Sequence, residues 1–389
     1  LAMALELRSN HLQITYYLGF VLLAFVLAEF IRAYHDKNIR RFIRQSMALG
    51  IVLIVAILTN AGNLYNTLSY SKYTTRGPSE LTIKADGTPN NEIKTNGLDR
   101  DYVTDWSYGK EESFSFIIPD VKGGATGSIG NDPALLKSIG ASQREFVAKN
   151  NRYWGDQRFT SGPVYLGIIM FWLFLLGLFS LKSRYKWAIL AVILLALFLS
   201  WGKNLMWFTD LFLNYMPGYN KFRAVTIILV IIEMLVPLLR LIYLNRLFFT
   251  SNVFLEKFKI GNKEIGSKFM VVSALLFFVL LFFFIAPDTF FTFFSDQEKT
   301  YFTGAINKNN AVQVQTMMDA LKDVRISIFK ADVLRSMGFL IVAFVVLVLY
   351  KTKTISSKVA IVGLGLLIII DPWGVDKRYL NNEKSRGKY

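Results

Sequence analysis

The chain has 389 residues, of which 53% are hydrophobic and 19% are charged, and its formal net charge is +16. Soluble domains are usually about one quarter charged, so this composition excludes an ordinary water-soluble fold and indicates a membrane protein. In a soluble protein such a positive charge would suggest nucleic-acid binding, so its position along the chain decides what it means.

A membrane-spanning helix needs roughly 20 mostly apolar residues, because the bilayer core offers no water to backbone polar groups. Tryptophans at the ends of the short stretches 187–201 and 359–371 are typical of span ends (Trp187, Trp201 and Trp373). The sequence therefore predicts an all-α polytopic membrane protein with about eight transmembrane helices, at 12–33, 45–62, 163–181, 187–201, 223–244, 269–287, 334–350 and 359–371.

The positive charge lies mainly in every second connection between these stretches. With their span ends, the segments 32–44, 182–186, 240–268 and 351–358 hold 17 basic residues and three acidic ones, a net charge of +14. Basic residues in short loops stay on the cytoplasmic side, so these four connections are predicted to be cytoplasmic. The charge is thus a topology signal and gives no evidence for nucleic acid as a partner.

The other connections are predicted to be external. The longest, 63–162, has 12 basic and 12 acidic residues and many turn residues and aromatics, which indicates a folded loop domain. In the second, the stretch Ala311 to Lys330 has the pattern of an amphipathic helix lying on the external face. The predicted organisation is two spans in 1–62, the loop domain 63–162, four spans in 163–287 with a basic external motif at 202–223, an external amphipathic segment 288–333, two spans in 334–371 and an external tail 372–389.

Both ends of the chain have the character of cut ends. The N-terminus, LAMALELRSN, has neither an initiator Met nor a basic signal-peptide region, and the tail stops without a folded unit. We therefore expect a fragment of a longer protein.

A basic motif lies before the fifth stretch, in SWGKNLMWFTDLFLNYMPGYNKFRAVTI. It places Lys203, Lys221 and Arg223 on the external side, where short loops carry few basic residues. Asn220 is predicted to cap a helix whose first backbone N–H groups, beside these cations, suit an anion. We interpret the motif as a lipid-phosphate-binding site; the alternative is ordinary snorkelling of the cations to lipid headgroups.

Aromatic and polar side chains enter the third stretch in NNRYWGDQRFTSGPVYLG. Tyr153, Trp154, Asp156 and Gln157 could stack on a sugar and fix its hydroxyls, or could anchor the chain at the membrane interface. His11 and Gln13 are interpreted as polar residues at the membrane interface that can line a substrate entrance.

Acidic residues provide weak candidates for a catalytic base. In DYVTDWSYGKEESFSFIIPD, any of Asp105, Glu111 and Glu112 could be the base, or the stretch could be a solvated acidic turn. Asp156 is a further candidate, and Asp105 and Asp156 are the two that we retain as weak candidates. Glu233 lies in the middle of the fifth stretch, where a charge marks either function or pairing with a neighbouring helix. With two histidines and no cysteine, a His/Cys metal cluster cannot form, and only a carboxylate-bound Mg²⁺ or Mn²⁺ remains open.

Several longer motifs resemble the bacterial YfhO-type membrane proteins, in their Bacteroidetes-like form. They are SNHLQITYY, TNAGNLYNTLSYSKYTTRGPSELT, DWSYGK, FIIPDVKGGATG, YWGDQRFTSGPVYLG, LSWGKN and MPGYNKFRAVT, and the resemblance covers about residues 5–380.

This resemblance implies a relative of the GT-C glycosyltransferases that moves a sugar from a polyprenyl-phosphate-linked donor to a cell-envelope polymer, such as lipoteichoic acid, at the outer face of the bacterial inner membrane. Its partners would be membrane lipids, the lipid-linked sugar and the polymer. Enzymes of this type usually keep their acidic catalytic residue in a first external loop, which we expect to lie upstream of this fragment. The alternatives are a transporter or flippase of lipid-linked glycans, with Glu233 as its coupling group, and a non-catalytic envelope assembly protein.

Overall fold

The computed structural model describes residues 1–77, 83, 97–250, 253–260, 263–306 and 310–380. The chain forms two compact units, each built from separate segments. The first unit comprises Leu1–Tyr108 and Ser183–Leu235, and the second comprises Gly109–Lys182 and Val236–Tyr389.

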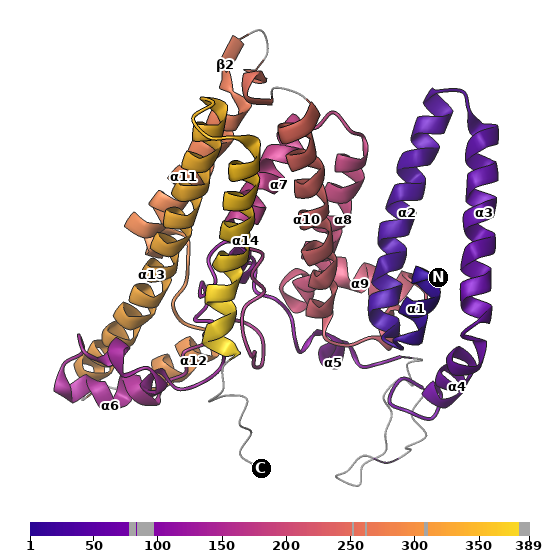
Figure 1. Cartoon of the computed structure of the whole chain (residues 1–389). Helices are drawn as coiled ribbons and strands as arrows, with labels where there is room; N and C mark the ends of the chain where they lie inside the picture. The colour runs from indigo at the N-terminus through magenta and orange to yellow at the C-terminus, as the bar shows by residue number, and fades with distance from the viewer. Residues whose placement is uncertain (78–82, 84–96, 251–252, 261–262, 307–309, 381–389) are drawn as a thin grey trace. The chain divides into compact units, whose positions relative to one another are not determined.

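The first unit is built from α-helices and short 3-10 turns (Figure 1). Its helices are α1 (Ala2–Arg8), α2 (Leu12–His35), α3 (Ile39–Leu58), α4 (Ala61–Ser71), α5 (Arg100–Thr104), α8 (Tyr185–Ser200) and α9 (Met206–Tyr215), and its turns are η4 (Gly202–Leu205), η5 (Tyr219–Lys221) and η6 (Val225–Ile228). Helix α10 (Leu229–Asn245) begins in this unit and ends in the second one.

Helix α2 is the centre of the first unit and lies between α3 and α8. On the α8 side, Tyr17 and Phe20 face Val192 and Ala196 around a small void. On the other side, α3 buries only Ala56 and leaves most of its apolar side chains exposed. A helix so apolar and so little buried requires apolar surroundings, which the bilayer supplies.

The second unit contains four long or apolar helices, α7 (Ile168–Ser180), α11 (Lys268–Ile285), α13 (Ala311–Lys351) and α14 (Ser357–Tyr379), and the short helices α6 (Ala141–Lys149) and α12 (Asp296–Ala305). Its short turns are η1 (Glu111–Phe116), η2 (Ile129–Asn131), η3 (Pro133–Leu136), a π-helical turn η7 (Arg246–Thr250), η8 (Val253–Leu255) and η9 (Pro287–Thr289). The strands β1 (Lys257–Ile260) and β2 (Lys263–Ser267) pair antiparallel as a hairpin.

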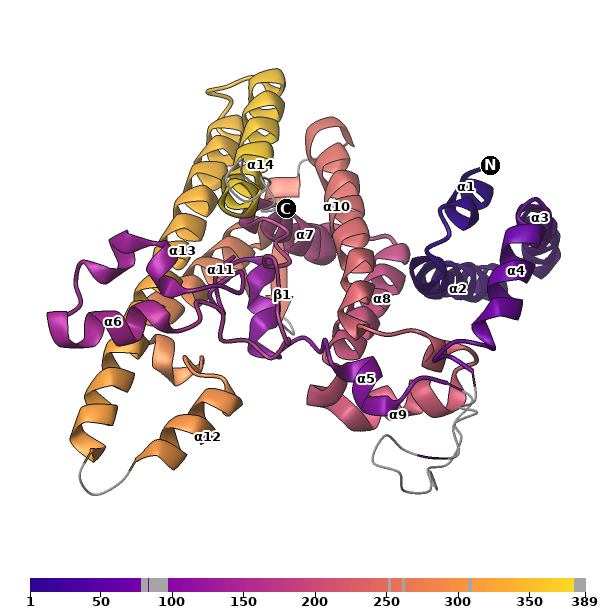
Figure 2. The same ribbon diagram turned by 90° about the horizontal axis from the view of Figure 1, so that it is seen from below.

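Helix α13 runs without a break for 41 residues. Its first half packs on α6, which crosses it in Figure 2, and Leu321, Val324 and Ile328 join Ile129, Val147 and other buried side chains in an apolar cluster. The amphipathic helix predicted at 311–330 is therefore present, but it is not a separate surface segment, because it continues directly into the span predicted at 334–350.

The membrane-spanning character predicted from the sequence is confirmed. Among the described residues, six helices are long and apolar enough to cross a membrane: α2, α3, α11, α13, α14 and the segment Val225–Phe249, which contains η6 and α10. The stretch 187–201 forms α8, which meets η4 and α9 at a bend of 111°, so that this pair counts as a broken or re-entrant span. The stretch 163–181 yields only the 13 residues of α7, because residues 163–167 are not helical.

Two predicted boundaries differ from the structure. The region 63–162 is not a unit of its own, since residues up to Tyr108 belong to the first unit and those from Gly109 to the second. The tail predicted from residue 372 is helical as far as Tyr379, because α14 continues through Pro372, and residues 381–389 lie outside the described part.

Candidate anion-binding cavity

A cavity of about 880 Å³ lies entirely within the first unit. Three segments far apart in the sequence form it: the start of α2 with the turn before it, α4 with the turn after it, and the segment between α9 and α10. Its lining includes the basic residues Arg76, Lys221 and Arg223 together with His11, Gln13 and Tyr16. The cavity thus gathers two groups of residues that the sequence suggested separately, at 11–13 and at 221–223.

Arg76 and Lys221 hold each other by main-chain contacts. The Arg76 Nε donates to the carbonyl of Lys221 at 2.9 Å, and the Lys221 Nζ donates to the carbonyl of Arg76 at 2.7 Å. In both contacts the acceptor is a neutral main-chain carbonyl. The pair therefore joins the turn after α4 to the end of η5, and both residues line the cavity.

Arg223 is positioned by two partners within the same unit. The Gln13 side chain donates to the Arg223 carbonyl at 2.8 Å, and the Arg223 guanidinium donates to the Tyr102 hydroxyl and lies 5.5 Å from the centre of that ring. The Tyr16 hydroxyl also donates to the carbonyl of Pro217 at 3.0 Å. The first turns of α2 thus fix the backbone that carries the basic motif.

The two residues predicted at the start of α2 have definite roles. His11 is the N-cap of α2, with its Nδ1 accepting from the Ile14 N–H at 3.4 Å. Gln13 is buried and also donates to the Tyr17 hydroxyl at 2.9 Å. Both residues line the cavity.

Helix α4 forms one wall of the cavity, mainly with one face, and Tyr65 and Tyr70 line the cavity from the two sides of that face. Leu64, Thr67, Leu68 and Ser71 are spaced three and four residues apart, so they lie on one side of the helix, and all four line the cavity. Helix α4 has no buried residue. Because α4 has no buried residue but lines the cavity with a continuous row of side chains, it is suited to contact a bound ligand.

The electrostatic character of the cavity is positive. Its lining has three basic residues and, among the described residues, no Asp or Glu. Desolvation lowers the pKa of Lys221 below its ordinary value. Apolar side chains from all three segments complete the walls (Leu12, Leu64, Leu68, Phe222 and Ile227). Such a site favours an anion attached to an apolar group.

The predicted cap at Asn220 is wrong. Asn220 lies inside η5, where its carbonyl accepts from the Leu98 N–H at 2.9 Å, and Gly218 precedes that turn. The helical segment that leads into α10 starts later, after Ala224, because Phe222 is extended and Ala224 has a left-handed backbone. The basic residues of the motif therefore reach the cavity without a helix N-terminus at Asn220.

Lys203 does not join the other two cations of the motif. It is exposed in η4, where its N–H donates to the Ser107 Oγ at 2.8 Å, and it is not among the cavity residues. The motif thus divides, with Lys221 and Arg223 at the cavity and Lys203 at the bend after α8.

The aromatic motif of the third stretch is buried in the second unit. Tyr153 and Trp154 are 5% and 1% exposed, so neither ring face is available to a sugar or to the membrane interface. Trp154 packs against Phe293 and under the Arg325 guanidinium, and its Nε1 donates to the Thr292 carbonyl at 3.1 Å. Both sequence interpretations of these rings are wrong, because residues distant in the chain cover them.

Glu112 is the centre of this buried region. It is 4% exposed and accepts from the Tyr153 hydroxyl at 2.9 Å, from the Gln157 side chain at 2.9 Å and from the Gly109 N–H at 3.1 Å. The solvated acidic turn is therefore wrong for Glu112. Its neighbour Glu111 instead pairs with the buried Lys122 at 2.7 Å.

The remaining acidic candidates are not among the residues that line the cavity. Asp105, at the end of α5, belongs to the first unit, and Asp156, beside Gly109, belongs to the second; neither lines the cavity. Glu233 lies on the exposed side of α10 next to Met234. Within the described ranges, no three His, Asp or Glu side chains gather closely enough to hold a metal ion.

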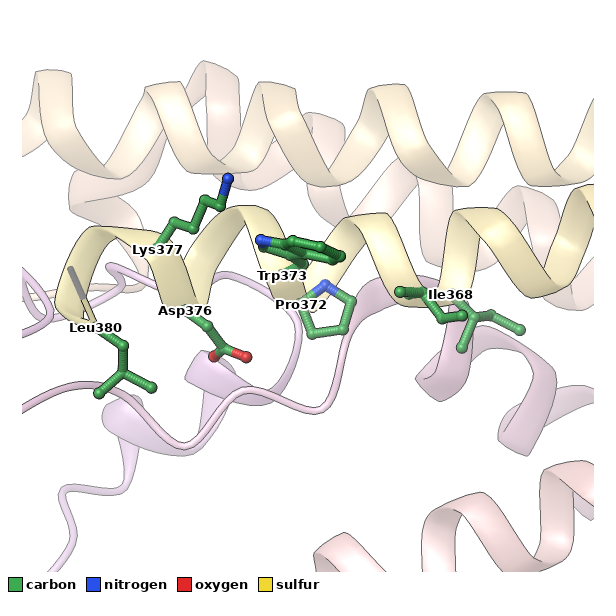
Figure 3. A pocket seen from close by; sticks show the side chains of 7 residues that line it. Ile368, Pro372, Trp373, Asp376, Lys377 and Leu380 are labelled. Carbon is green, nitrogen blue, oxygen red and sulfur yellow. The ribbon is translucent and has the colours of Figure 1, made fainter. Parts of the chain in front are cut away.

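A second, shallower hollow of about 630 Å³ lies against α14 in the second unit (Figure 3). All of its lining residues come from the end of that helix, among them Pro372, Trp373 and Asp376. The Lys377 ammonium lies 5.2 Å from the Trp373 ring, and Trp373 is largely exposed. An exposed Trp with a Lys beside it at a span end is typical of an interfacial anchor, as the sequence predicted for Trp373.

Arg76 and α4 are the parts of the cavity that the sequence did not indicate. Arg76 belongs to a long loop with balanced charge, so its charge does not stand out there, whereas Lys221 and Arg223 stand out in a short loop.

No protein-family model, curated protein or solved structure matches this chain.

Proposed function

We propose that this multi-pass membrane protein is part of a GT-C-type glycosyltransferase of the bacterial inner membrane. It would transfer a sugar from a polyprenyl-phosphate-linked donor to a cell-envelope acceptor at the external face. The observation that supports the proposal best is the cavity with Arg76, Lys221 and Arg223 on an apolar wall. The motifs that resemble those of YfhO-type proteins and the predicted external position of 202–223 support it as well.

In this reaction an acceptor hydroxyl attacks the anomeric carbon of the donor, the bond from that carbon to the phosphate oxygen breaks, and a carboxylate base takes the hydroxyl proton. Lys221 and Arg223 would stabilise the negative charge that develops on the departing lipid phosphate. The base is not assigned to Asp105 or Asp156, since neither lies at the cavity.

The test compares the protein in lipid nanodiscs with its Arg223→Ala variant. We expect the protein to release polyprenyl phosphate from a panel of polyprenyl-phosphate sugars when envelope polymer is added, as followed by mass spectrometry. Loss of one charge-assisted contact in the transition state predicts a fall in rate of roughly tenfold to a hundredfold.

Arg8→Ala is the matched control, because Arg8 is exposed in the same unit and lies outside the cavity. Unchanged turnover and unchanged donor binding in Arg223→Ala would refute the proposal. Movement of intact donor between leaflets without its consumption would instead identify a flippase.

A further inference from the structure

Helix α9 leaves α8 at an angle that turns it along the membrane. Helix α8 packs against α2 and η6, which belong to two of the spans, and Trp187 and Trp201 stand near its two ends, as is typical of a helix that reaches both interfaces. Its 16 residues measure about 24 Å, most of a hydrocarbon core of about 30 Å. The bend of 111° exceeds a right angle by about 20°, which is the ordinary tilt of a spanning helix. Helix α9 therefore runs close to the plane of the bilayer.

Contacts with α2 indicate how deep α9 lies. The Phe212 ring centre lies 6.0 Å from that of Phe20, and the Tyr16 hydroxyl donates to the carbonyl of Pro217, just beyond α9, at 3.0 Å. At the rise of an α-helix, Tyr16 and Phe20 lie roughly 6 and 12 Å from Leu12, where α2 begins, and the whole helix measures roughly 36 Å. Helix α9 thus lies beside the first third of this span, neither beyond its end nor at its middle.

One side of α9 packs on the protein. The Phe208 ring centre lies 5.9 Å from that of Phe198 in α8, and Thr209 is buried. Asp210, the single charged residue of α9, accepts from the Arg100 guanidinium of α5 at 2.6 and 2.8 Å. The inner side of the helix and its charge are therefore covered or paired within the first unit.

The opposite side is mostly apolar, aromatic and exposed. Trp207, Leu211 and Tyr215 follow one another at intervals of four residues, so they lie on one face, and they are 66%, 46% and 80% exposed. Asn214 is the polar residue on this face, near the end of the helix. Trp and Tyr suit the boundary between membrane and water, because the ring is apolar and its N–H or O–H can bond to headgroups. Since α8 also exposes Leu194, the lipid that surrounds this span adjoins the start of α9.

We propose that α9 is an interfacial helix, seated between lipid headgroups and acyl chains, with Trp207, Leu211 and Tyr215 in contact with phospholipid. A helix in this position buries its apolar face about 5–10 Å into the boundary between headgroups and chains. Gly218 and Lys221 follow Tyr215 within six residues and line the cavity, so α9 holds this part of the cavity wall at headgroup depth. The contact with lipid does not depend on the reaction that the cavity supports.

Spin labels on single cysteines test the depth of α9, because the sequence contains no other thiol. Leu211→Cys and Tyr215→Cys are labelled with a nitroxide, with the full chain in phosphatidylcholine nanodiscs. Power saturation with oxygen and with a water-soluble nickel chelate then gives the depth of each label. We expect both labels roughly 5–10 Å below the headgroups. Leu23→Cys, at an exposed position in the middle of α2, is the deep reference at about 15 Å, and Thr75→Cys, exposed after α4, is the reference for water.

Three results would overturn the inference. Labels on α9 that are as accessible to nickel as the Thr75→Cys label would place the helix in water. A depth equal to that of the Leu23→Cys label would show a re-entrant segment in the bilayer core. Strongly immobilised labels that are shielded from both reagents would show that a protein, rather than lipid, covers this face.

A second measurement needs no introduced thiol. Phosphatidylcholine that is brominated near the glycerol end of its acyl chains should quench a smaller share of the fluorescence in Trp207→Phe than in the unaltered protein. Trp172→Phe is the matched control, because Trp172 is fully buried and offers lipid no exposed surface, so its replacement should not lower the quenched share. An unchanged quenched share in Trp207→Phe would contradict the contact of Trp207 with lipid.

Discussion

Neutral groups take part in positioning each of the cavity cations. Arg76 and Lys221 exchange bonds with each other's carbonyls, and Arg223 is held through Gln13 and Tyr102. A paired carboxylate would cancel the charge that an anionic ligand needs, whereas a carbonyl or phenol orients the side chain and leaves its charge available. These contacts orient the cationic side chains without using the charge that would bind an anion.

A buried carboxyl group in the second unit makes the stability of the protein depend on pH. Burial raises the pKa of Glu112 above its ordinary value of 4.5, more than its hydrogen-bond donors lower it, and the nearby charge of Asp156 raises it further. Above pH 4.5 the unfolded chain ionises while the folded chain retains the proton. Stability should therefore fall as pH rises from that value through the folded pKa, by at most about 1.4 kcal/mol per pH unit.

Glu112→Gln removes this titration and keeps the size of the side chain. We expect its melting midpoint, measured in detergent across the same pH range, to decline less steeply than that of the unaltered protein. Other buried carboxyls titrate in both proteins, so the difference between the two curves isolates Glu112. Glu145→Gln, at an exposed pair with Lys149, should follow the unaltered curve closely, and parallel curves for Glu112→Gln would contradict the argument.

Arg325 is fully buried and joins α13 to α12. Its terminal nitrogens donate to the Glu298 carboxylate at 2.6 and 2.8 Å and to the carbonyls of Phe293 and Asn151, each at 2.8 Å. Arg325→Met leaves a carboxylate and two carbonyls without their donor. We expect a loss of about 3–5 kcal/mol in unfolding free energy.

Lys322→Met, one turn away on the same helix, provides the comparison in denaturant titrations. Lys322 pairs with Asp288 at 3.2 Å with both side chains well exposed, so its loss should cost less than about 1 kcal/mol. Similar losses for the two variants would show that burial does not strengthen the Arg325 contacts.

At the scale of elements, the bend of 111° between α8 and the segment Gly202–Tyr215 depends on a glycine. Gly202, at the bend, has a φ of +44°, a backbone conformation that favours glycine. A Cβ at Gly202 would lie 2.1 Å from the Ser107 Oγ and 2.8 Å from the Val225 side chain, so neighbouring side chains leave no room for a larger residue there.

Gly202→Ala should therefore combine backbone strain with a steric clash and destabilise the protein by roughly 2–4 kcal/mol. Gly218→Ala separates the two effects, because Gly218 also has positive φ (+78°) but open space where a Cβ would be. We expect about 1 kcal/mol for Gly218→Ala in the same melting experiments. A larger loss at Gly218 than at Gly202 would contradict this account of the bend.

The membrane-spanning helices could be predicted from the sequence, because their hydropathy is a property of one segment. The burial of individual side chains could not, where it depends on residues distant in the chain. Long apolar stretches such as those of α2 and α11 must become spans, because hydropathy along one segment is sufficient. Trp154 is covered by residues more than a hundred positions away, including Thr292 and Phe293, so no local pattern indicates its burial. The contacts of Glu112 with Tyr153 and Gln157 also join separate parts of the chain.

The candidate site was predictable in the same limited sense. Lys221 and Arg223 stand out because the distribution of basic residues along a membrane chain is itself informative. That His11, Gln13 and Arg76 share one cavity with them follows only from the fold, which brings together three segments separated by two long stretches of chain.

At the scale of the whole molecule, the distribution of the +16 charge predicts an orientation in the membrane that can be measured directly. The absence of cysteine from the sequence means that each introduced cysteine is the only thiol in the protein. Each unit has an exposed position in a connection predicted to be cytoplasmic and another in a connection predicted to be external. The predicted cytoplasmic positions are Asp36 in the first unit and Thr354 in the second, and the predicted external positions are Thr75 in the first unit and Glu145 in the second. None of these replacements removes a basic residue, so the charge distribution that sets the orientation is preserved.

We expect a membrane-impermeant maleimide to label Thr75→Cys and Glu145→Cys in intact cells. Asp36→Cys and Thr354→Cys should react only after permeabilisation, because the basic residues that flank them hold these loops in the cytoplasm. Labelling of Asp36→Cys together with Thr75→Cys would place both ends of α3 on one side and exclude that helix as a span. Labelling of Asp36→Cys and Thr354→Cys alone would invert the orientation and place the cavity cations on the cytoplasmic side, where a donor at the external face could not reach them.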